Sequence, residues 1–362
     1  METRIIEEFK KQLPVEQIKV DEPLAKHTTL KVGGPADLFL VVKKEDELIN
    51  VVELAKKLKI DFIILGWGSN VLISDAGFRG LVIKNQTQEI EILGPAPEIK
   101  HETKVEKEVD RHEHVEVEGK KYPIKFDDLD YDESDLPAKL VSVSTGVPLA
   151  NLIHWSHEHG LTGLQWYSRI PGTVGGAVFN NIHGGTHFFG EIIWEVTILD
   201  VDGQLRTLKV KDLELAYDKS RFHDSKEVIV NVTLRLPQGD VEKAKHIALE
   251  WAQRKSVQPS NSAGCTFKNI SQEEKERLGY PSTSIAYIIE WILKWSNKKI
   301  GDARISEKHH AFIVNDGKAT AADVLEMIKE IQRGIKEKTG IHLEPEIFFI
   351  GFSSRELKGI TH

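Results

Sequence analysis

The residues of this chain whose types suggest chemistry begin with its single cysteine, Cys265. It lies in the stretch SAGCTFKN, whose small and polar residues differ from the apolar surroundings that usually bury a structural cysteine. A thiol with a pKa of about 8.5 is mostly protonated at neutral pH, so it can donate a proton as readily as it can act as a nucleophile. Taken alone, a chemically inert buried cysteine is the simpler interpretation.

A second candidate is Glu346, in the run LEPEI at residues 343–347. This carboxylate stands at the entry to an apolar strand, where partial burial would raise its pKa or orient it toward a substrate. A solvent-exposed strand end is the simpler interpretation of this residue alone. His101, His112 and His114 lie in a charged stretch without a companion cysteine or an ordered spacing, so no metal site is expected.

Two glycine clusters, at residues 66–70 (GWGSN) and 170–177 (IPGTVGGA), could cradle a phosphate group. Glycine lets backbone N–H groups turn toward a bound anion because no Cβ obstructs the approach. The first cluster is not a dinucleotide fingerprint, since no helix opens immediately after it. A tight turn would explain the first cluster alone, and a helix–strand packing contact the second. Their joint occurrence favours a diphosphate-binding site.

The elements that position these residues fall into three regions, because 362 residues exceed what one hydrophobic core usually organises. We assign residues 1–86 and 87–238 to two lobes, and residues 239–362 to a C-terminal domain. In the first lobe, strand-like runs at 36–42 and 62–65 flank a helical pattern, which gives a βαβ-like unit.

The remaining elements follow from apolar spacing and turn residues. A charged insertion at about residues 94–139, expected to carry a hairpin, interrupts the second lobe. In the C-terminal domain, Thr320 and Asp323 form a capping box, and Gly340 suits the end of the helix that follows it. The other expected elements are strands at 71–73, 81–83, 194–199 and 228–236, helices at 148–159 and after residue 240, and a final strand, EIFFIG.

Composition excludes several classes of function. A net charge of −8 argues against a nucleic-acid-binding protein, because a surface that follows phosphates needs an excess of Lys and Arg. A single cysteine permits no intrachain disulfide, and the start METRIIEEFKKQ lacks the apolar core of a signal peptide. No apolar run approaches the roughly 20 residues that span a bilayer. We therefore expect a cytoplasmic protein without membrane insertion; nothing in the sequence specifies an oligomeric state.

Five segments, taken in order, resemble the family of UDP-N-acetylenolpyruvoylglucosamine reductases, also called UDP-N-acetylmuramate dehydrogenases. They are KHTTLKVGGPADLF, ILGWGSNVLISDAGFRGLVI, GLTGLQWYSRIPGTVGGAV, SAGCTFKN, and ISEKHHAFIVNDGKATAADVL with LEPEIFFIG. The match covers most of the chain outside the insertion, and the joint occurrence is far more specific than either glycine loop.

The resemblance implies an α+β fold, with a two-lobed FAD-binding module of the vanillyl-alcohol-oxidase type and a C-terminal α+β substrate domain. It implies noncovalent FAD, NADPH as co-substrate and a UDP-amino-sugar substrate, in a step of peptidoglycan synthesis that serves cell-wall biogenesis, cell shape and cell division. The implied cofactor-binding residues are Gly66, Trp67, Gly68, Ser69, Asn70, Val71, Thr145, Gly146, Ile170, Pro171, Gly172, Thr173, Gly175 and Gly176.

The resemblance also assigns catalytic and substrate-binding roles. Cys265 stands where the family generally has a serine that protonates the substrate, and Glu346 matches the family's catalytic glutamate. A thiol is intrinsically the stronger acid, so the replacement is chemically sensible. Tyr217, Lys268 and Asn269 would contact the substrate.

Asp218 departs from the family pattern. The family carries a catalytic arginine directly after a tyrosine, and an aspartate reverses the sign of any interaction with a substrate carboxylate. We expect Arg221 to supply the missing positive charge, with Arg169 as the second choice. On a strand Arg221 would face away from residue 218, so this role for Arg221 requires a turn between the two residues. The segment NNIHGGTHFFGE also departs from the family.

Two alternatives stay open at this point. Asp218 would fit a flavin- or sugar-nucleotide-binding protein that has lost catalysis. An oxidase on the same FAD scaffold is the other alternative, although the SAGCTFKN and LEPE segments argue against it.

Overall fold

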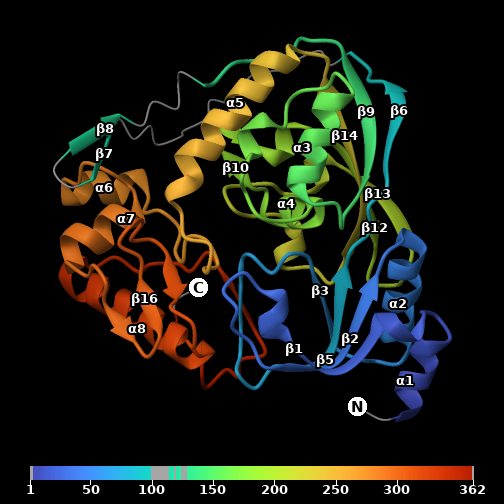
Figure 1. Ribbon diagram of the computed structural model, residues 1–362, viewed down its shortest axis with the longest axis horizontal. Coiled ribbons are helices and arrows are strands. Elements are labelled where there is room, and N and C mark those ends of the chain that lie inside the picture. Colours follow the sequence, from blue (N-terminus) through green and yellow to red (C-terminus); the bar gives the residue numbers. More distant parts are fainter. Residues whose placement is uncertain (1–2, 99–113, 118–119, 124–128, 361–362) are drawn as a thin grey trace.

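The computed structural model describes residues 3–98, 114–117, 120–123 and 129–360 (Figure 1). His101, His112 and part of the charged insertion lie outside the described residues. The described elements form three groups that follow one another along the chain. The expected boundaries at 86 and 238 fall in connections between elements and remain a prediction.

The first group consists of α1 (Thr3–Lys10), β1 (Ile18–Pro23), β2 (Pro35–Val42), α2 (Glu45–Lys57), β3 (Phe62–Leu65), β4 (Val71–Ile73) and β5 (Phe78–Asn85). Four of the strands form a sheet in the order β1-β2-β5-β3, in which β2, β5 and β3 are parallel. Helix α2 presents Leu48, Val51, Val52 and Ala55 on one face, and all four are buried. The expected βαβ-like unit is therefore confirmed, with β5 between its two strands.

The second group consists of β6 (Ile90–Pro95), β7 (His114–Val117), β8 (Lys120–Pro123), β9 (Ala138–Ser144), α3 (Leu149–Glu158), α4 (Val174–Asn180), β10 (His183–Gly184), β11 (His187–Phe188), β12 (Ile193–Leu199), β13 (Leu205–Lys209) and β14 (Val228–Pro237). Five of its strands form an antiparallel sheet, β13-β12-β14-β9-β6. Strands β6 and β9 flank the insertion yet pair directly with each other, so the sheet is continuous across it. The expected hairpin in the insertion is confirmed as β7–β8.

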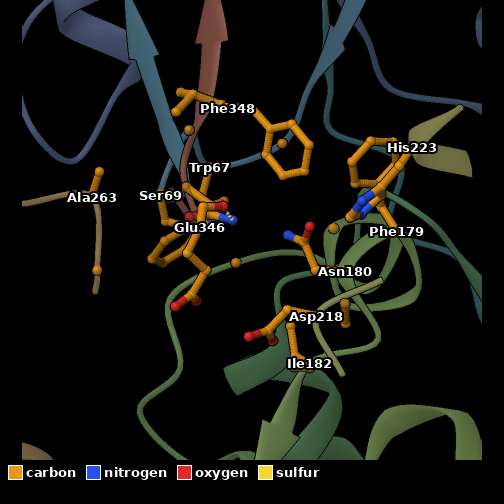
Figure 2. A pocket seen from close by; sticks show the side chains of 18 of the residues that line it. Trp67, Ser69, Phe179, Asn180, Ile182, Asp218, His223, Ala263, Glu346 and Phe348 are labelled. Carbon is orange, nitrogen blue, oxygen red and sulfur yellow. Dashed lines mark hydrogen bonds between the residues drawn. The ribbon is translucent and has the colours of Figure 1, made fainter. Parts of the chain in front are cut away.

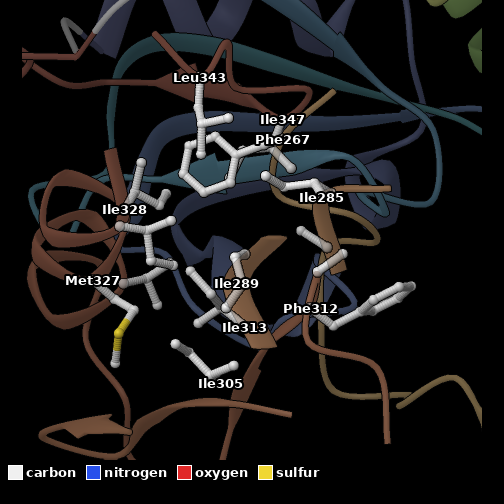
Figure 3. Packing of buried hydrophobic residues seen from close by; sticks show 14 of the residues in the cluster. Phe267, Ile285, Ile289, Ile305, Phe312, Ile313, Met327, Ile328, Leu343 and Ile347 are labelled. Carbon is white, nitrogen blue, oxygen red and sulfur yellow. The ribbon is translucent and has the colours of Figure 1, made fainter. Parts of the chain in front are cut away.

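The third group consists of α5 (Val241–Arg254), α6 (Gln272–Leu278), α7 (Ile285–Tyr287), the π-helix η8 (Ile288–Leu293), β15 (Lys299–Ile300), β16 (Ala303–Ile305), β17 (Ile313–Asn315), α8 (Ala321–Thr339) and β18 (Phe348–Ile350). Figure 3 shows its core, where Ile328 of α8 packs with Ile289, Ile313 and Phe267. The expected capping box is confirmed, because Thr320 and Asp323 exchange hydrogen bonds of 2.9 and 3.1 Å at the start of α8.

Strand β18 leaves the third group and pairs in parallel with β4 of the first. A second contact joins the same groups, since the Asp75 carboxylate accepts the backbone N–H groups of Ala321 and Ala322 at 2.8 and 3.0 Å. The N-terminus of α8 is thus satisfied by a side chain from the first group. These contacts hold the residues that precede β18 against the first glycine cluster.

No helix in the described part of the chain is both long and apolar enough to cross a bilayer. The most apolar stretch forms α7 and η8, which lie in the core of the third group.

Candidate active site

A cavity of about 2250 Å³ is lined by residues from all three groups of elements. Both glycine clusters and the thiol-bearing segment contribute to its walls. The site residues predicted from the sequence that line it are 66–71, 145, 170–173, 175, 176, 217, 265, 269 and 346. Gly146, Lys268 and Arg221 are absent from its lining.

The first glycine cluster connects β3 to β4 in a turn that needs glycine at one position. Gly68 has φ +67°, and a Cβ there would lie 2.4 Å from the carbonyl oxygen of His27. The Ser69 hydroxyl donates to the carbonyl of Pro171 at 2.7 Å. This bond ties the first glycine cluster directly to the second.

The second glycine cluster runs into α4. Thr173 begins this helix as its N-cap, and the N–H of Gly175 donates to the carbonyl of Thr145 at 2.9 Å. Gly172 and Gly176 differ from Gly175, because a Cβ at either would meet no protein atom closer than 3.8 Å. Side chains at these two positions would therefore project into free space beside the cluster rather than into protein.

A smaller cavity of about 350 Å³ shares Trp67 and Asn85 with the main one. Gly146 lies here, beside Lys84. Burial lowers the pKa of Lys84 to about 8, and its ammonium donates to the carbonyl of Gly66. Lys84 thus places a positive charge immediately behind the first glycine cluster.

The thiol of Cys265 and the carboxyl of Glu346 are brought together by backbone pairing. The N–H of Glu346 donates to the carbonyl of Thr266 at 2.9 Å, so Glu346 lies beside the thiol-bearing segment. Burial raises the pKa of Cys265 well above its usual value, and Glu346 and Asp218 add to the effect. Burial and then Asp218 raise the pKa of Glu346 as well. In both groups the burial therefore favours the protonated form relative to the same group in water.

Asp218 faces the same space as Glu346. Figure 2 shows the two carboxyl groups pointing into one part of the cavity from different segments. Asp218 is 8% exposed and has φ 47°, in a tight turn closed by the paired residues Ala216 and Lys219. Burial raises the pKa of Asp218, opposed by His183, Lys268 and a hydrogen bond from Tyr217.

Tyr217 and Asn269 lie beside this acid pair. The Asn269 side chain hydrogen-bonds to the Tyr217 hydroxyl, and its Oδ1 accepts the N–H of Ile285 at 3.1 Å. Lys268 points elsewhere, since its ammonium contacts Glu344 Oε1 at 2.5 Å. Lys268 therefore acts on the acid pair through its charge and not as a cavity-lining contact.

The structure corrects the expectation for Arg221. Its guanidinium donates twice to Glu227, at 2.9 Å each, and once to the carbonyl of Asp212 at 2.9 Å. The turn that would allow Arg221 to replace the missing cation is present at Asp218. Arg221 nevertheless hydrogen-bonds to other protein groups and does not line the cavity. Arg169, the second choice, does line the cavity, with φ 62°.

Two cavity residues were missed from the sequence, His183 and Lys255. His183 is half-buried beside Asp218 and its ring centroid lies 5.1 Å from that of Tyr217, while burial lowers its pKa. Burial also lowers the pKa of Lys255 to about 8. The sequence indicated His183 only through the segment NNIHGG, which departs from the residues usual in the family. No feature of the sequence singled out Lys255.

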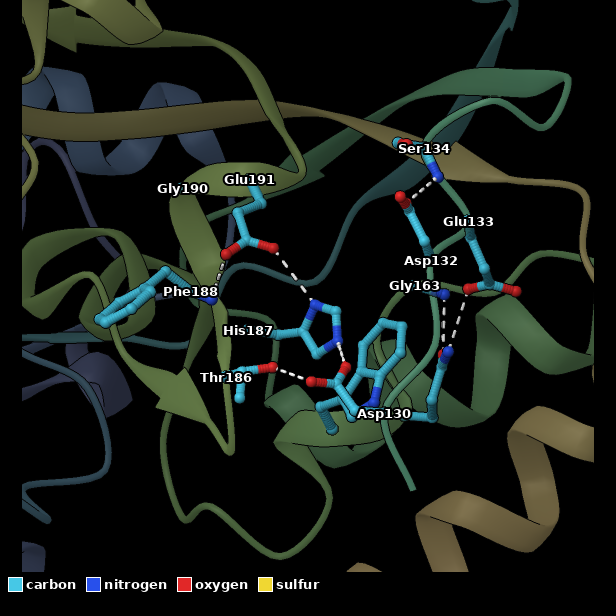
Figure 4. A network of polar contacts seen from close by, with 12 residues as sticks. Asp130, Asp132, Glu133, Ser134, Gly163, Thr186, His187, Phe188, Gly190 and Glu191 are labelled. Carbon is cyan, nitrogen blue, oxygen red and sulfur yellow. Dashed lines mark hydrogen bonds and ion pairs between the residues drawn. The ribbon is translucent and has the colours of Figure 1, made fainter. Parts of the chain in front are cut away.

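A polar network holds the β10–β11 hairpin that carries His183 (Figure 4). His187 lies between Asp130 and Glu191, with Nδ1 3.2 Å from the Glu191 carboxylate, and stacks on Trp166 at a ring separation of 3.6 Å. Asp130 also accepts the hydroxyl of Thr186. The end of the insertion is thereby fixed against one wall of the cavity.

Comparisons with known proteins agree on one family. A model of the C-terminal domain of UDP-N-acetylenolpyruvoylglucosamine reductase matches residues 256–350, and a model of an FAD binding domain matches residues 120–209. A reductase of that name from Lachnoclostridium phytofermentans is 32% identical over 97% of this chain and 98% of its own. The Bacillus subtilis reductase is 30% identical over 96% and 98%.

A solved structure is similar throughout. The crystal structure of UDP-N-acetylenolpyruvylglucosamine reductase from Thermus caldophilus superposes with a TM-score of 0.66 at 26% identity. The superposition covers 92% of this chain and 99% of that one.

Proposed function

This chain belongs to the UDP-N-acetylenolpyruvoylglucosamine reductase family, and we propose from this that it uses NADPH to reduce the enolpyruvyl group of UDP-N-acetylglucosamine enolpyruvate, giving UDP-N-acetylmuramate. The chain is an FAD-dependent oxidoreductase of peptidoglycan synthesis. We assign the step to the cytoplasm and, through cell-wall biogenesis, to cell shape and division. A protein without catalysis and an oxidase are not favoured, because relatives matched over nearly the whole chain are named reductases.

One observation carries the proposal: both glycine clusters, Cys265 and Glu346 line the same cavity. The FAD held by these residues would supply hydride transfer from NADPH to the substrate. The carbon next to the one that receives the hydride then needs a proton. The protonated thiol of Cys265 supplies it, and the carboxyl of Glu346 donates a hydrogen bond to the developing negative charge.

The glycine clusters fit FAD because free space adjoins them. A Cβ at Gly172 or Gly176 would find no close protein neighbour, so a side chain there would fill the space left for a ligand. Lys84 adds a cation behind the first cluster, which suits a diphosphate. We assign the FAD to residues 66–71, Thr145, Gly146 and the second cluster.

Anaerobic stopped-flow absorbance tests the function. NADPH should bleach the flavin band near about 450 nm, and UDP-N-acetylglucosamine enolpyruvate should then restore it. A protein that NADPH reduces but that the enolpyruvyl substrate never reoxidises would contradict the assignment. Rapid reoxidation of the reduced flavin by oxygen, with a hydroxy compound as substrate, would instead support an oxidase function.

Enlarging the side chain at Gly172 should weaken FAD binding in steps. We expect Gly172→Ala to have a small effect and Gly172→Leu to raise the dissociation constant about tenfold or more, because the larger side chain occupies the ligand's space. Titration of the apoprotein with FAD measures the affinity. The melting temperature of the apoprotein serves as the control and should stay nearly unchanged, since the nearest protein atoms to a Cβ at this position, Ser69 Oγ and Leu149 Cδ1, lie 3.8 and 3.9 Å away. Equal affinities across the series would place the cofactor elsewhere.

A further inference from the structure

Asp218 is a buried acid whose surroundings leave one oxygen without a partner. Its side chain is over nine-tenths buried, it lines the cavity, and its Oδ2 has no hydrogen-bond partner among the described residues. Buried polar atoms are nearly always paired, and a buried carboxylate left unpaired is strongly unfavourable. Because the carboxyl group of Asp218 also lines the cavity, a ligand group that enters there can complete its hydrogen bonding.

The backbone at Asp218 is also unusual. Its φ of 47° lies in the left-handed region, which few residues other than Gly, Asn and Asp adopt readily. The turn formed by Ala216 and Lys219 fixes this conformation and directs the side chain into the cavity. The orientation of the carboxyl is therefore set by the backbone before any ligand binds.

The charged and titratable groups around Asp218 come from every segment that faces it. They are His183 on β10, the adjacent Tyr217, Cys265 and Lys268 on the thiol-bearing segment, and Glu346 before β18. Neither basic residue near Asp218 neutralises its charge fully. The Lys268 ammonium is paired with Glu344, and burial lowers the pKa of His183, which favours its uncharged form.

Two buried carboxyl groups that face the same cavity cannot both ionise readily. Burial raises the pKa of Asp218 as well as that of Glu346, and an anionic substrate group would raise both further. The substrate of the proposed function carries such a group, the carboxylate of its enolpyruvyl moiety. A neutral carboxylic acid donates a hydrogen bond to a carboxylate, whereas an ionised one repels it.

We propose that Asp218 binds the enolpyruvyl carboxylate as a neutral acid, through a hydrogen bond from its carboxyl O–H to a carboxylate oxygen. A neutral donor thus recognises the anion at this position without a cation. The inference rests on the proposed function, because the carboxylate belongs to that substrate.

The test is the equilibrium affinity of oxidised, FAD-loaded protein for UDP-N-acetylglucosamine enolpyruvate, followed by the change in flavin absorbance without NADPH. Asp218→Asn keeps an N–H donor and suits the left-handed backbone, so its affinity at pH 7 should stay within about threefold of the wild type. Asp218→Gly removes the donor without backbone strain and should bind about tenfold more weakly or worse. The exposed Asp224, replaced by Asn, is the matched control and should change nothing.

The pH dependence adds a second readout. Wild-type affinity should fall as pH rises through the titration of the acid pair, because the donor becomes an anion; Asp218→Asn should show a smaller fall. Binding by Asp218→Gly that equals or exceeds wild-type binding would overturn the assignment. An ionised Asp218 would repel the substrate carboxylate, so removing its side chain would strengthen binding. If wild-type protein holds FAD but does not bind the enolpyruvyl compound, the proposed function itself fails, and this inference fails with it.

Discussion

Replacing Cys265 with alanine should slow reoxidation of the reduced flavin by the enolpyruvyl substrate about 10²-fold or more, while reduction by NADPH proceeds at the wild-type rate. The thiol is the acid that we place at the carbon left without a proton after hydride transfer, and burial raises the pKa of this thiol so that its protonated form is favoured. Anaerobic stopped-flow separates the two half-reactions, so a loss confined to the second is diagnostic.

Serine provides the matched rescue at this position. A hydroxyl at 265 can donate a proton from nearly the same place, so Cys265→Ser should retain substantial activity where Cys265→Ala does not. The segment is held by its backbone, through the N–H of Thr266 and the carbonyl of Ala311 at 2.8 Å, so neither variant should lose its fold or its flavin. Normal turnover by Cys265→Ala would show that the proton comes from another group.

Replacing Glu346 with alanine is expected to slow the same half-reaction about 10²- to 10³-fold, because a donor aimed at developing charge is lost. Its backbone contacts should survive, since Thr266 and Asn70 bind only its N–H and carbonyl. Glu346→Gln keeps a hydrogen-bond donor and should lose much less. Stopped-flow reoxidation measures both variants, with the exposed Glu337→Ala of α8 as the control.

The role of Glu346 also predicts how the rate of flavin reoxidation changes with pH. Burial raises the pKa of Glu346, so its donor is present below that raised pKa and is lost as pH rises through it. The wild-type rate should decline toward alkaline pH, and Glu346→Gln should remove the part of the decline that belongs to this group. A rate for Glu346→Ala close to that of the wild type would assign the charge stabilisation to other residues.

Sequence patterns predicted those helices and strands that are determined by interactions between residues close together in the sequence. Helix α8 begins at the capping box of Thr320 and Asp323 and ends at Gly340, as its sequence indicates, because cap hydrogen bonds involve residues a turn apart. Segment resemblance selected Cys265 and Glu346, and the structure places them side by side. Neither residue alone carried enough signal to be preferred over its simpler interpretation.

The differences from the sequence predictions concern side-chain partners that only the tertiary structure supplies. Arg221 was expected to replace a missing cation, but Glu227 and the Asp212 carbonyl satisfy its guanidinium after the turn at Asp218. Lys268 was expected to contact the substrate, and its ammonium is paired with Glu344. His183 and Lys255 gain their significance from burial, which depends on packing between segments distant in sequence.

The pairing of β18 with β4 has a consequence for biosynthesis. Phe348 pairs with Val71, so the ribosome must deliver the whole of the intervening chain before the first lobe acquires this strand. Until then Glu346 is not held beside the first glycine cluster, and a nascent chain has no complete wall for its cofactor. The part of the cavity lined by Phe348, Phe349 and Ile350 is therefore completed only when the last strand of the chain has been synthesised.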